Sequence, residues 1–307
     1  MTLAAWAAAL EEPAGARRRP AWTYRRLFGE VATALRPGVA DAREIGRSVA
    51  GEPIWAVTVA HPGAAASPVL VLAGLHALEH PGPRTAVALL HRAARGEGGW
   101  DRRRLVVVPL ANPDGFLGVE AALAGRGRRY HRANGRGVDL NRNFAEGWDA
   151  RPSRFLPKIF SPGPAPLSEP ETQALDALAA AERPAFVVSL HAFGEWIYVP
   201  WASRREPTPD EDRLLSLARA MASRMRRPYR VVPLAQRSRF FRARGAEIDH
   251  FYARHGALSF LFEIGVGPRL AHPSTWLDPY RWYTPEEDRL RADVDNVLPA
   301  LDLLADA

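Results

Sequence analysis

The stretch Val69-Leu-Val-Leu-Ala-Gly-Leu-His-Ala-Leu-Glu-His-Pro-Gly82 decides the class of fold. Its first five residues are all apolar, which is typical of a strand covered on both faces, and Gly74 ends the run. His76 and Glu79 follow at once, and in open α/β sheets ligands bind just beyond the carboxyl ends of strands. Because His and Glu are both ligands of first-row metals, the stretch predicts a metal-binding turn at the end of a buried strand.

The rest of the chain alternates short β-branched runs with helical periodicity. Strands are expected at 54–59, 69–73, 105–110, 186–190, 196–199 and 258–264. Helices are expected at 83–95, 169–181, 210–225 and 286–304. This alternation predicts an α/β domain around a largely parallel sheet.

The residues His76-Ala-Leu-Glu-His80 also spell the inverted zincin motif, in which both histidines bind zinc and Glu79 is the base. That arrangement needs both histidines on one face of a continuous helix. Pro81 disfavours the α region for His80, and the preceding run is strand-like. We therefore favour His76 and Glu79 as ligands, with His80 as a neighbour.

Two further apolar strands carry polar residues that suit the same chemistry. His191 ends the run 187–190, and two ligands close in sequence plus a distant one are the pattern of catalytic zinc. Glu263 lies in the run 258–264, where desolvating an unpaired carboxylate costs several kcal/mol. An ion pair with arginine is one interpretation of Glu263, and a general base with a raised pKa is the one we favour.

Composition excludes several classes of protein. The 307 residues are 47% hydrophobic and 24% charged, as in ordinary globular domains, and there is no cysteine for a disulfide scaffold. The net charge of +7 comes from scattered arginines, so we expect no nucleic-acid partner. No apolar run is long enough to cross a membrane, and Met1–Leu10 lacks a basic leader, so we expect a cytoplasmic protein with no membrane partner.

Six motifs together resemble the zinc carboxypeptidase family, the funnel-shaped metallocarboxypeptidases. They are G-L-H-A-L-E (74–79), N-P-D-G (112–115), G-V-D-L-N-R-N-F (137–144), S-E-P-E-T (168–172), S-L-H-A-F-G (189–194) and F-E-I-G (262–265). They follow the family's order. The resemblance implies an α/β fold with a mixed, twisted, roughly eight-stranded sheet flanked by helices. It places the catalytic domain at 44–307, with residues 1–43 as a helical extension packed on it.

The resemblance also implies roles for particular residues. His76, Glu79 and His191 match the ligands of one Zn²⁺ per chain, and Glu263 matches the general base. Asp139 matches the carboxylate that orients the first histidine. The other matches concern the substrate: Asn141 and Arg142 grip its terminal carboxylate, and Arg132, with Arg128 and Arg129 as alternatives, stabilises the oxyanion.

Phe241 is the main departure from the family, since a mobile tyrosine of the family covers the substrate at this position. An aromatic lid without the hydroxyl is expected instead. Ile248 resembles the apolar pocket residue of members that prefer aliphatic or aromatic C-termini. No role is assigned to the other histidines, for which a solvated or structural place is the default: His61, His80, His91, His131, His250, His255 and His272.

The implied activity is hydrolysis of the C-terminal peptide bond by a zinc-bound water that Glu263 activates, on a peptide with a free C-terminal carboxylate. A zinc amidohydrolase of the same fold, acting on cell-wall peptides or N-acyl amino acids, is an alternative motivated by Phe241. An inert binding module is a third, weaker hypothesis. The sequence leaves the oligomeric state open.

Overall fold

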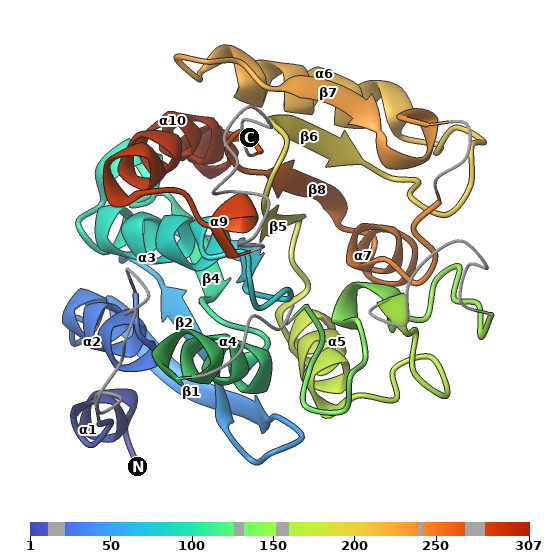
Figure 1. The fold of residues 1–307 in the computed structure, drawn as a ribbon. Helices are drawn as coiled ribbons and strands as arrows, with labels where there is room; N and C mark the ends of the chain where they lie inside the picture. The colour runs from blue at the N-terminus through green and yellow to red at the C-terminus, as the bar shows by residue number, and fades with distance from the viewer. Residues whose placement is uncertain (12–21, 126–131, 152–159, 239–241, 268–279) are drawn as a thin grey trace.

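A single mixed sheet runs through the molecule (Figure 1), seen here in a computed structural model that describes residues 1–11, 22–125, 132–151, 160–238, 242–267 and 280–307. The strands lie in the order β1-β2-β4-β3-β5-β8-β6-β7. Their bounds are Ala40–Arg47 (β1), Pro53–Val59 (β2), Ala65–Ala73 (β3), Arg103–Val108 (β4), Phe186–His191 (β5), Trp196–Val199 (β6), Arg230–Pro233 (β7) and Leu258–Glu263 (β8). The predicted mixed, eight-stranded fold is confirmed.

The narrower expectation of a largely parallel sheet is wrong for three pairs. The central strands β4, β3, β5 and β8 pair in parallel, as do β6 and β7 at one edge, but the pairs β1–β2, β2–β4 and β6–β8 are antiparallel. A tight turn joins β1 to β2, closed by the hydrogen bond that Ser48 N donates to Glu52 O at 2.8 Å. A connection this short leaves no room for a crossover helix, so the two strands must run in opposite directions.

Alternate residues of each central strand enter two separate cores. Val69 and Val71 of β3 belong to one core and Leu70 and Leu72 to the other, as the period of two in a strand requires. Helices cover both faces, which explains the unbroken apolar runs in the sequence. The first core lies under α2 (Tyr24–Ala34), α3 (Pro81–Ala94), α6 (Glu211–Ser223) and α10 (Glu287–Asp306). The second lies under α5 (Pro170–Glu182) and α7 (Glu247–His255).

Within the described parts of the chain, the remaining helical elements connect or extend this sandwich. They are α1 (Leu3–Ala8), α4 (Pro113–Gly125), α9 (Tyr280–Tyr283) and the 3₁₀ turns η1 (Glu97–Gly99), η2 (Leu140–Arg142) and η4 (Leu234–Gln236). Both N-terminal helices contribute side chains to the first core, among them Leu3 and Leu27. Residue 44 lies inside β1, and the division of the chain there stays a prediction. Within the described residues, every helix is too short or too polar to cross a lipid bilayer.

The sheet brings the ends of three parallel strands together. Ala73 of β3 pairs with Leu190 of β5, and His191 of β5 pairs with Glu263 of β8. Whatever follows these positions therefore meets at the carboxyl edge of the sheet, although the three strands come from distant stretches of the sequence.

Candidate metal centre

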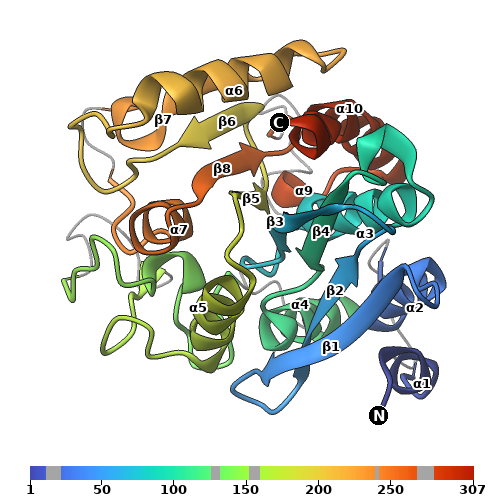
Figure 2. The same cartoon turned by 180° about the vertical axis from the view of Figure 1, so that it is seen from behind.

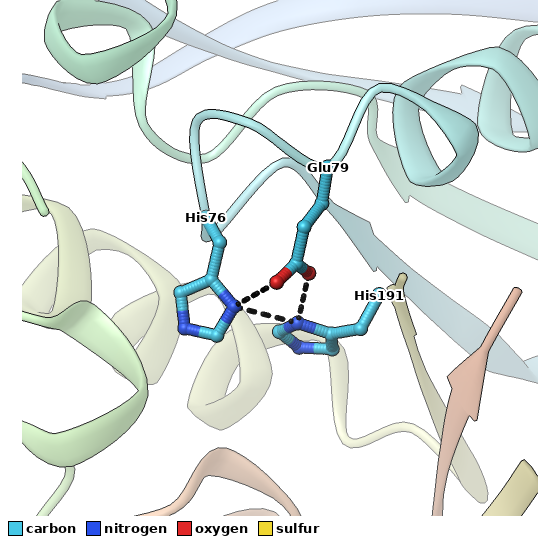
Figure 3. Close-up of side chains that lie close together, drawn as sticks. All are labelled: His76, Glu79 and His191. Atoms are coloured by element: carbon cyan, nitrogen blue, oxygen red, sulfur yellow. Dashed lines mark hydrogen bonds and ion pairs between the residues drawn. The ribbon is translucent and has the colours of Figure 1, made fainter. Parts of the chain in front are cut away.

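Three predicted side chains meet at the carboxyl edge of the sheet (Figure 3). His76 Nδ1 lies 2.9 Å from Glu79 Oε1, His191 Nδ1 lies 2.8 Å from Glu79 Oε2, and the two Nδ1 atoms are 3.0 Å apart. All three residues are buried. The turn can form because Gly74, directly after β3, adopts φ +68°, where a Cβ would collide with Leu110.

The other ring nitrogen of each histidine faces a carboxylate. His76 Nε2 lies 3.0 Å from Asp139 Oδ1, and His191 Nε2 lies 3.0 Å from Glu247 Oε1 and 2.9 Å from Ser189 Oγ. A carboxylate only accepts hydrogen bonds, so we assign the proton of each neutral ring to Nε2. Each Nδ1 then points its lone pair at the same centre as Glu79.

The carboxylates favour a positive charge at the centre of this group, carried by a proton on His191 or, when both rings are neutral, by a metal ion. Burial alone would lower the pKa of His191, but the carboxylates of Glu79 and Glu247 raise it to about 10. Burial likewise opposes ionisation of Glu79, yet His76 and His191 hold its pKa below the usual range. Two lone pairs 3.0 Å apart beside a carboxylate fit a divalent cation, and a His₂Glu set leaves the fourth position that catalytic zinc keeps for substrate or water.

Asp139 connects the metal group (His76, Glu79 and His191) to the arginine region, which contains Arg132 and Arg142. It is fully buried and accepts hydrogen bonds from His76 Nε2, from Asn141 N at 3.0 Å and from Arg132 Nε at 2.9 Å. Burial alone would raise its pKa, but Arg132 and His76 hold the pKa of Asp139 well below its usual value. Asp139 is therefore a fixed negative charge that orients both His76 and Arg132.

The two predicted arginines lie on either side of this carboxylate in the sequence. Arg132 Nη1 also approaches Glu79 Oε1 to 3.5 Å, which places its guanidinium beside the metal group. Arg142 is buried, and its Nη1 donates to Asn141 O at 2.5 Å. The guanidinium carbons of Arg132 and Arg142 lie 5.1 and 5.9 Å from the ring centroid of Phe160, so both face one region.

Glu263 ends β8, beside His191 in the sheet register. Burial, and next the negative charge of Glu79, raise its pKa to about 8, while His191 and Arg132 act in the opposite direction. No hydrogen bond to its carboxylate is found among the described residues. The side chain thus binds a proton more strongly than an exposed carboxylate does, which suits a group that takes up and returns a proton.

The remaining predicted residues fall in different places. Asn141 is buried, and its Oδ1 accepts a hydrogen bond from Glu247 N at 3.1 Å. Ile248 is also buried, in an apolar cluster with Tyr198, Leu234 and Leu261 among others. Phe241, Arg128 and Arg129 lie outside the described residues, so their predicted roles stay predictions.

His80 corrects one step of the sequence argument. We expected Pro81 to keep it out of the α region, but its φ of −60° and ψ of −25° are helical, and it is the N-cap of α3. The effect of a following proline is a bias that burial can override, and His80 is buried with its ring stacked on Phe116, 4.6 Å between centroids. It stays outside the group formed by His76, Glu79 and His191.

Sequence reasoning missed Glu247 and Ser189, both of which contact His191 Nε2. Ser189 precedes His191 by two residues in the same strand and shares its face, so the strand period could have revealed it. Glu247 carries no local signal, because it reaches His191 from the first turn of α7.

Comparison with known proteins decides the family. The family model described as zinc carboxypeptidase matches residues 29–296. The chain belongs to the zinc carboxypeptidase family. Zinc is the metal of that family, which confirms the cofactor prediction and agrees with the donor set of His76, Glu79 and His191.

Two relatives of this protein have names that state different activities. Mast cell carboxypeptidase A of Mus musculus is 25% identical over 74% of this chain, and murein peptide amidase A of Escherichia coli K12 is 38% identical over 48% of it. The alignments span 58% and 57% of those proteins' own lengths. Bovine thrombin-activatable fibrinolysis inhibitor, solved with a tick carboxypeptidase inhibitor, shares the fold with a TM-score of 0.72 at 21% identity, covering 92% of this chain and 94% of that one.

Proposed function

We propose that this protein is a zinc-dependent carboxypeptidase that releases the C-terminal residue of peptides with a free terminal carboxylate. The observation that carries the proposal is the convergence of His76, Glu79 and His191 beside the carboxyl group of Glu263. These four side chains supply a metal site and a proton acceptor at one edge of the sheet.

The metal provides the polarisation that hydrolysis needs. Zinc held by these three ligands would acidify a water molecule and polarise a carbonyl oxygen. Glu263 accepts the proton of the attacking water at its carboxylate and returns it to the leaving amine. The guanidinium of Arg132, held by Asp139, stabilises the negative charge that develops on the carbonyl oxygen.

Substrate selection follows from charge. Arg142 offers a guanidinium for a terminal carboxylate, which it can bind through two parallel hydrogen bonds. Asn141 adds an amide next to it. Ile248 favours an apolar C-terminal residue, and Phe241 would cover the substrate as an aromatic lid without a hydroxyl.

A zinc amidohydrolase acting on cell-wall peptides is the second candidate. The 38% identity with murein peptide amidase A over 48% of this chain supports it, whereas mast cell carboxypeptidase A matches a longer part, 74%, at 25% identity. The metal group and the base would be the same in both cases, and the difference would lie in the group that the substrate presents.

A peptide library read by mass spectrometry tests both candidates. The zinc-loaded protein is incubated with peptides of varied C-terminus and with murein tripeptide, with and without a chelator. Loss of single C-terminal residues, abolished by the chelator, is the expected result. Cleavage confined to murein tripeptide would favour the second candidate, and intact substrates throughout would contradict both.

A further inference from the structure

A second group of metal-ligand side chains lies between α5 and α7. Asp176 comes from α5, whereas His250 and His255 come from α7 (Figures 1 and 2 show the two helices as neighbours). One ligand atom from each residue lies within 4.8 Å of the other two. None of the three residues takes part in the group formed by His76, Glu79 and His191.

The imidazole rings of His250 and His255 both contact the same carboxylate oxygen of Asp176. His250 Nε2 lies 2.8 Å and His255 Nε2 lies 2.7 Å from Asp176 Oδ1, and the ring centroids are 5.4 Å apart. The side chain of His250 is 2% exposed, that of His255 11% and that of Asp176 33%. The group is therefore fixed on its inner side by the core and open to water on its outer side.

The first metal group provides an internal standard for this geometry. Its nitrogen and oxygen donors approach one another to 2.8–3.0 Å. The separations of 2.7 and 2.8 Å around Asp176 are of the same size. Ligands of tetrahedral zinc at about 2.0–2.1 Å from the ion need only a small outward movement from such positions.

The donor chemistry points to the same class of ion. Two imidazole nitrogens and one carboxylate oxygen suit zinc and other late first-row divalent metals, whereas calcium and magnesium take oxygen ligands. The ring of the fully buried Phe144 lies 5.3 Å from the ring of His250.

We propose that Asp176, His250 and His255 form a second, structural site for a divalent transition-metal ion of the zinc class. A bound ion would fasten the last turn of α7 to α5. The first residue of the same helix is Glu247, which contacts His191 Nε2. The second ion would thus stabilise the helix that carries this contact, without touching the substrate.

Metal counting on variants tests this site independently of any activity. The full-length protein is equilibrated with zinc, passed through a desalting column and analysed by mass spectrometry of the metal. We expect about two zinc ions per chain in the unmodified protein and about one in Asp176→Asn and in His255→Gln. His91→Gln, which alters a histidine outside both groups, is the matched control and is expected to retain both ions.

A fourth variant separates the two sites. Glu79→Gln removes a ligand from the first group and is expected to retain the ion of the second. Circular dichroism verifies that each variant is folded. A single zinc in the unmodified protein, or full retention of two in folded Asp176→Asn and His255→Gln, would overturn the proposal, as would a zinc-free Glu79→Gln.

Discussion

At the scale of single residues, Glu263 is the group on which the proposed chemistry depends. Burial and Glu79 raise its pKa to about 8, so it binds a proton more strongly than an exposed carboxylate, as suits a group that must take up a proton and give it back. Glu263→Gln keeps the shape of the side chain but removes the proton acceptor. We expect kcat to fall by about 10²–10⁴-fold while the zinc content is unchanged.

Peptide turnover and metal analysis on the same preparation check this expectation. Glu211→Gln in α6 is the matched control, because it makes the same chemical change away from the metal group. Turnover by Glu263→Gln within a few-fold of the unmodified protein would remove Glu263 from its assigned role.

A second prediction at this scale concerns Glu247 and the affinity for zinc. Its carboxylate lies against His191 Nε2, and such partners raise the basicity of a metal-binding ring. Glu247→Gln removes the charge but not the side chain. We expect the affinity for zinc to weaken about 10-fold or more, as measured by competition with a chromophoric chelator. Unaltered affinity would show that this contact does not serve the metal site.

The residues of the candidate site differ in how readily they can be predicted from the sequence. His76 and Glu79 lie within one turn after an apolar strand, so a local pattern was enough to predict them. His191 and Glu263 stand at the ends of two other apolar strands, where polar groups need an explanation. Glu247 could not be predicted, because its contact with His191 bridges 56 positions and depends on where α7 is packed.

At the scale of elements, two loops must pass each other closely to build the arginine region. Gly245, before α7, has φ +66°, and a Cβ there would collide with the backbone carbonyl of Arg142. Phe144 N also donates to Gly245 O at 3.1 Å. The position of Arg142 thus depends on a glycine in a different segment.

Two alanine substitutions separate backbone strain from this close approach. Gly256 has the same φ of +66°, but a Cβ at this position would meet nothing within 4 Å, so Gly256→Ala is expected to cost only about 1–2 kcal/mol. Gly245→Ala adds the collision and is expected to cost a further ~1–3 kcal/mol, and to raise KM through Arg142. Urea unfolding and steady-state kinetics check both effects, and equal costs would refute the close approach.

A buried acid at the start of α5 gives a prediction about pH. Glu171 accepts hydrogen bonds from Val49 N and Asn134 Nδ2, both at 3.1 Å, and burial raises its pKa. The unfolded chain therefore releases this proton first as pH rises. Between the unfolded pKa of about 4.3 and the higher folded pKa, the free energy of unfolding should fall, by about 1.4 kcal/mol for each pH unit that separates the two values.

Comparison with Glu171→Gln isolates this titration. The stability of the unmodified protein relative to the variant should decrease as pH rises above about 4, since only the unmodified protein carries the group. Urea unfolding at a series of pH values provides the measurement. Parallel curves for the two proteins would contradict the raised pKa.

The strands could be predicted from the sequence where both of their faces are buried. The strands β3, β4, β5 and β8 have continuous apolar runs, and all of them were expected. β1 and β7 were not expected, because both lie at edges of the sheet and neither has a buried apolar run. The sequence of β1, Ala-Asp-Ala-Arg-Glu-Ile-Gly-Arg, has only one buried residue. The antiparallel pairs β1–β2, β2–β4 and β6–β8 were also missed, since the periodicity of a strand does not encode the direction of its partner.

At the scale of the whole molecule, the N-terminal helices share a core with the sheet. The ring of Trp6 in α1 lies 4.8 Å from that of Phe28 in α2 and 5.7 Å from that of Trp55 in β2. Because α1 and α2 pack against the sheet in this way, we expect them to unfold together with it, even though the sequence predicts residues 1–43 to be an extension.

Trp6→Ala tests whether the molecule unfolds as one unit. Removing this ring should lower the free energy of unfolding by about 3–5 kcal/mol, because neighbouring rings cannot fill the space. We expect a single transition at a lower urea concentration, with an unchanged dependence of the unfolding free energy on urea. Val266→Ala, at an exposed position, is the control and is expected to leave the midpoint unchanged. If instead α1 and α2 detach first, two transitions will appear and the main one will keep its midpoint. That result would make the N-terminal helices a separate layer docked on an independently stable domain.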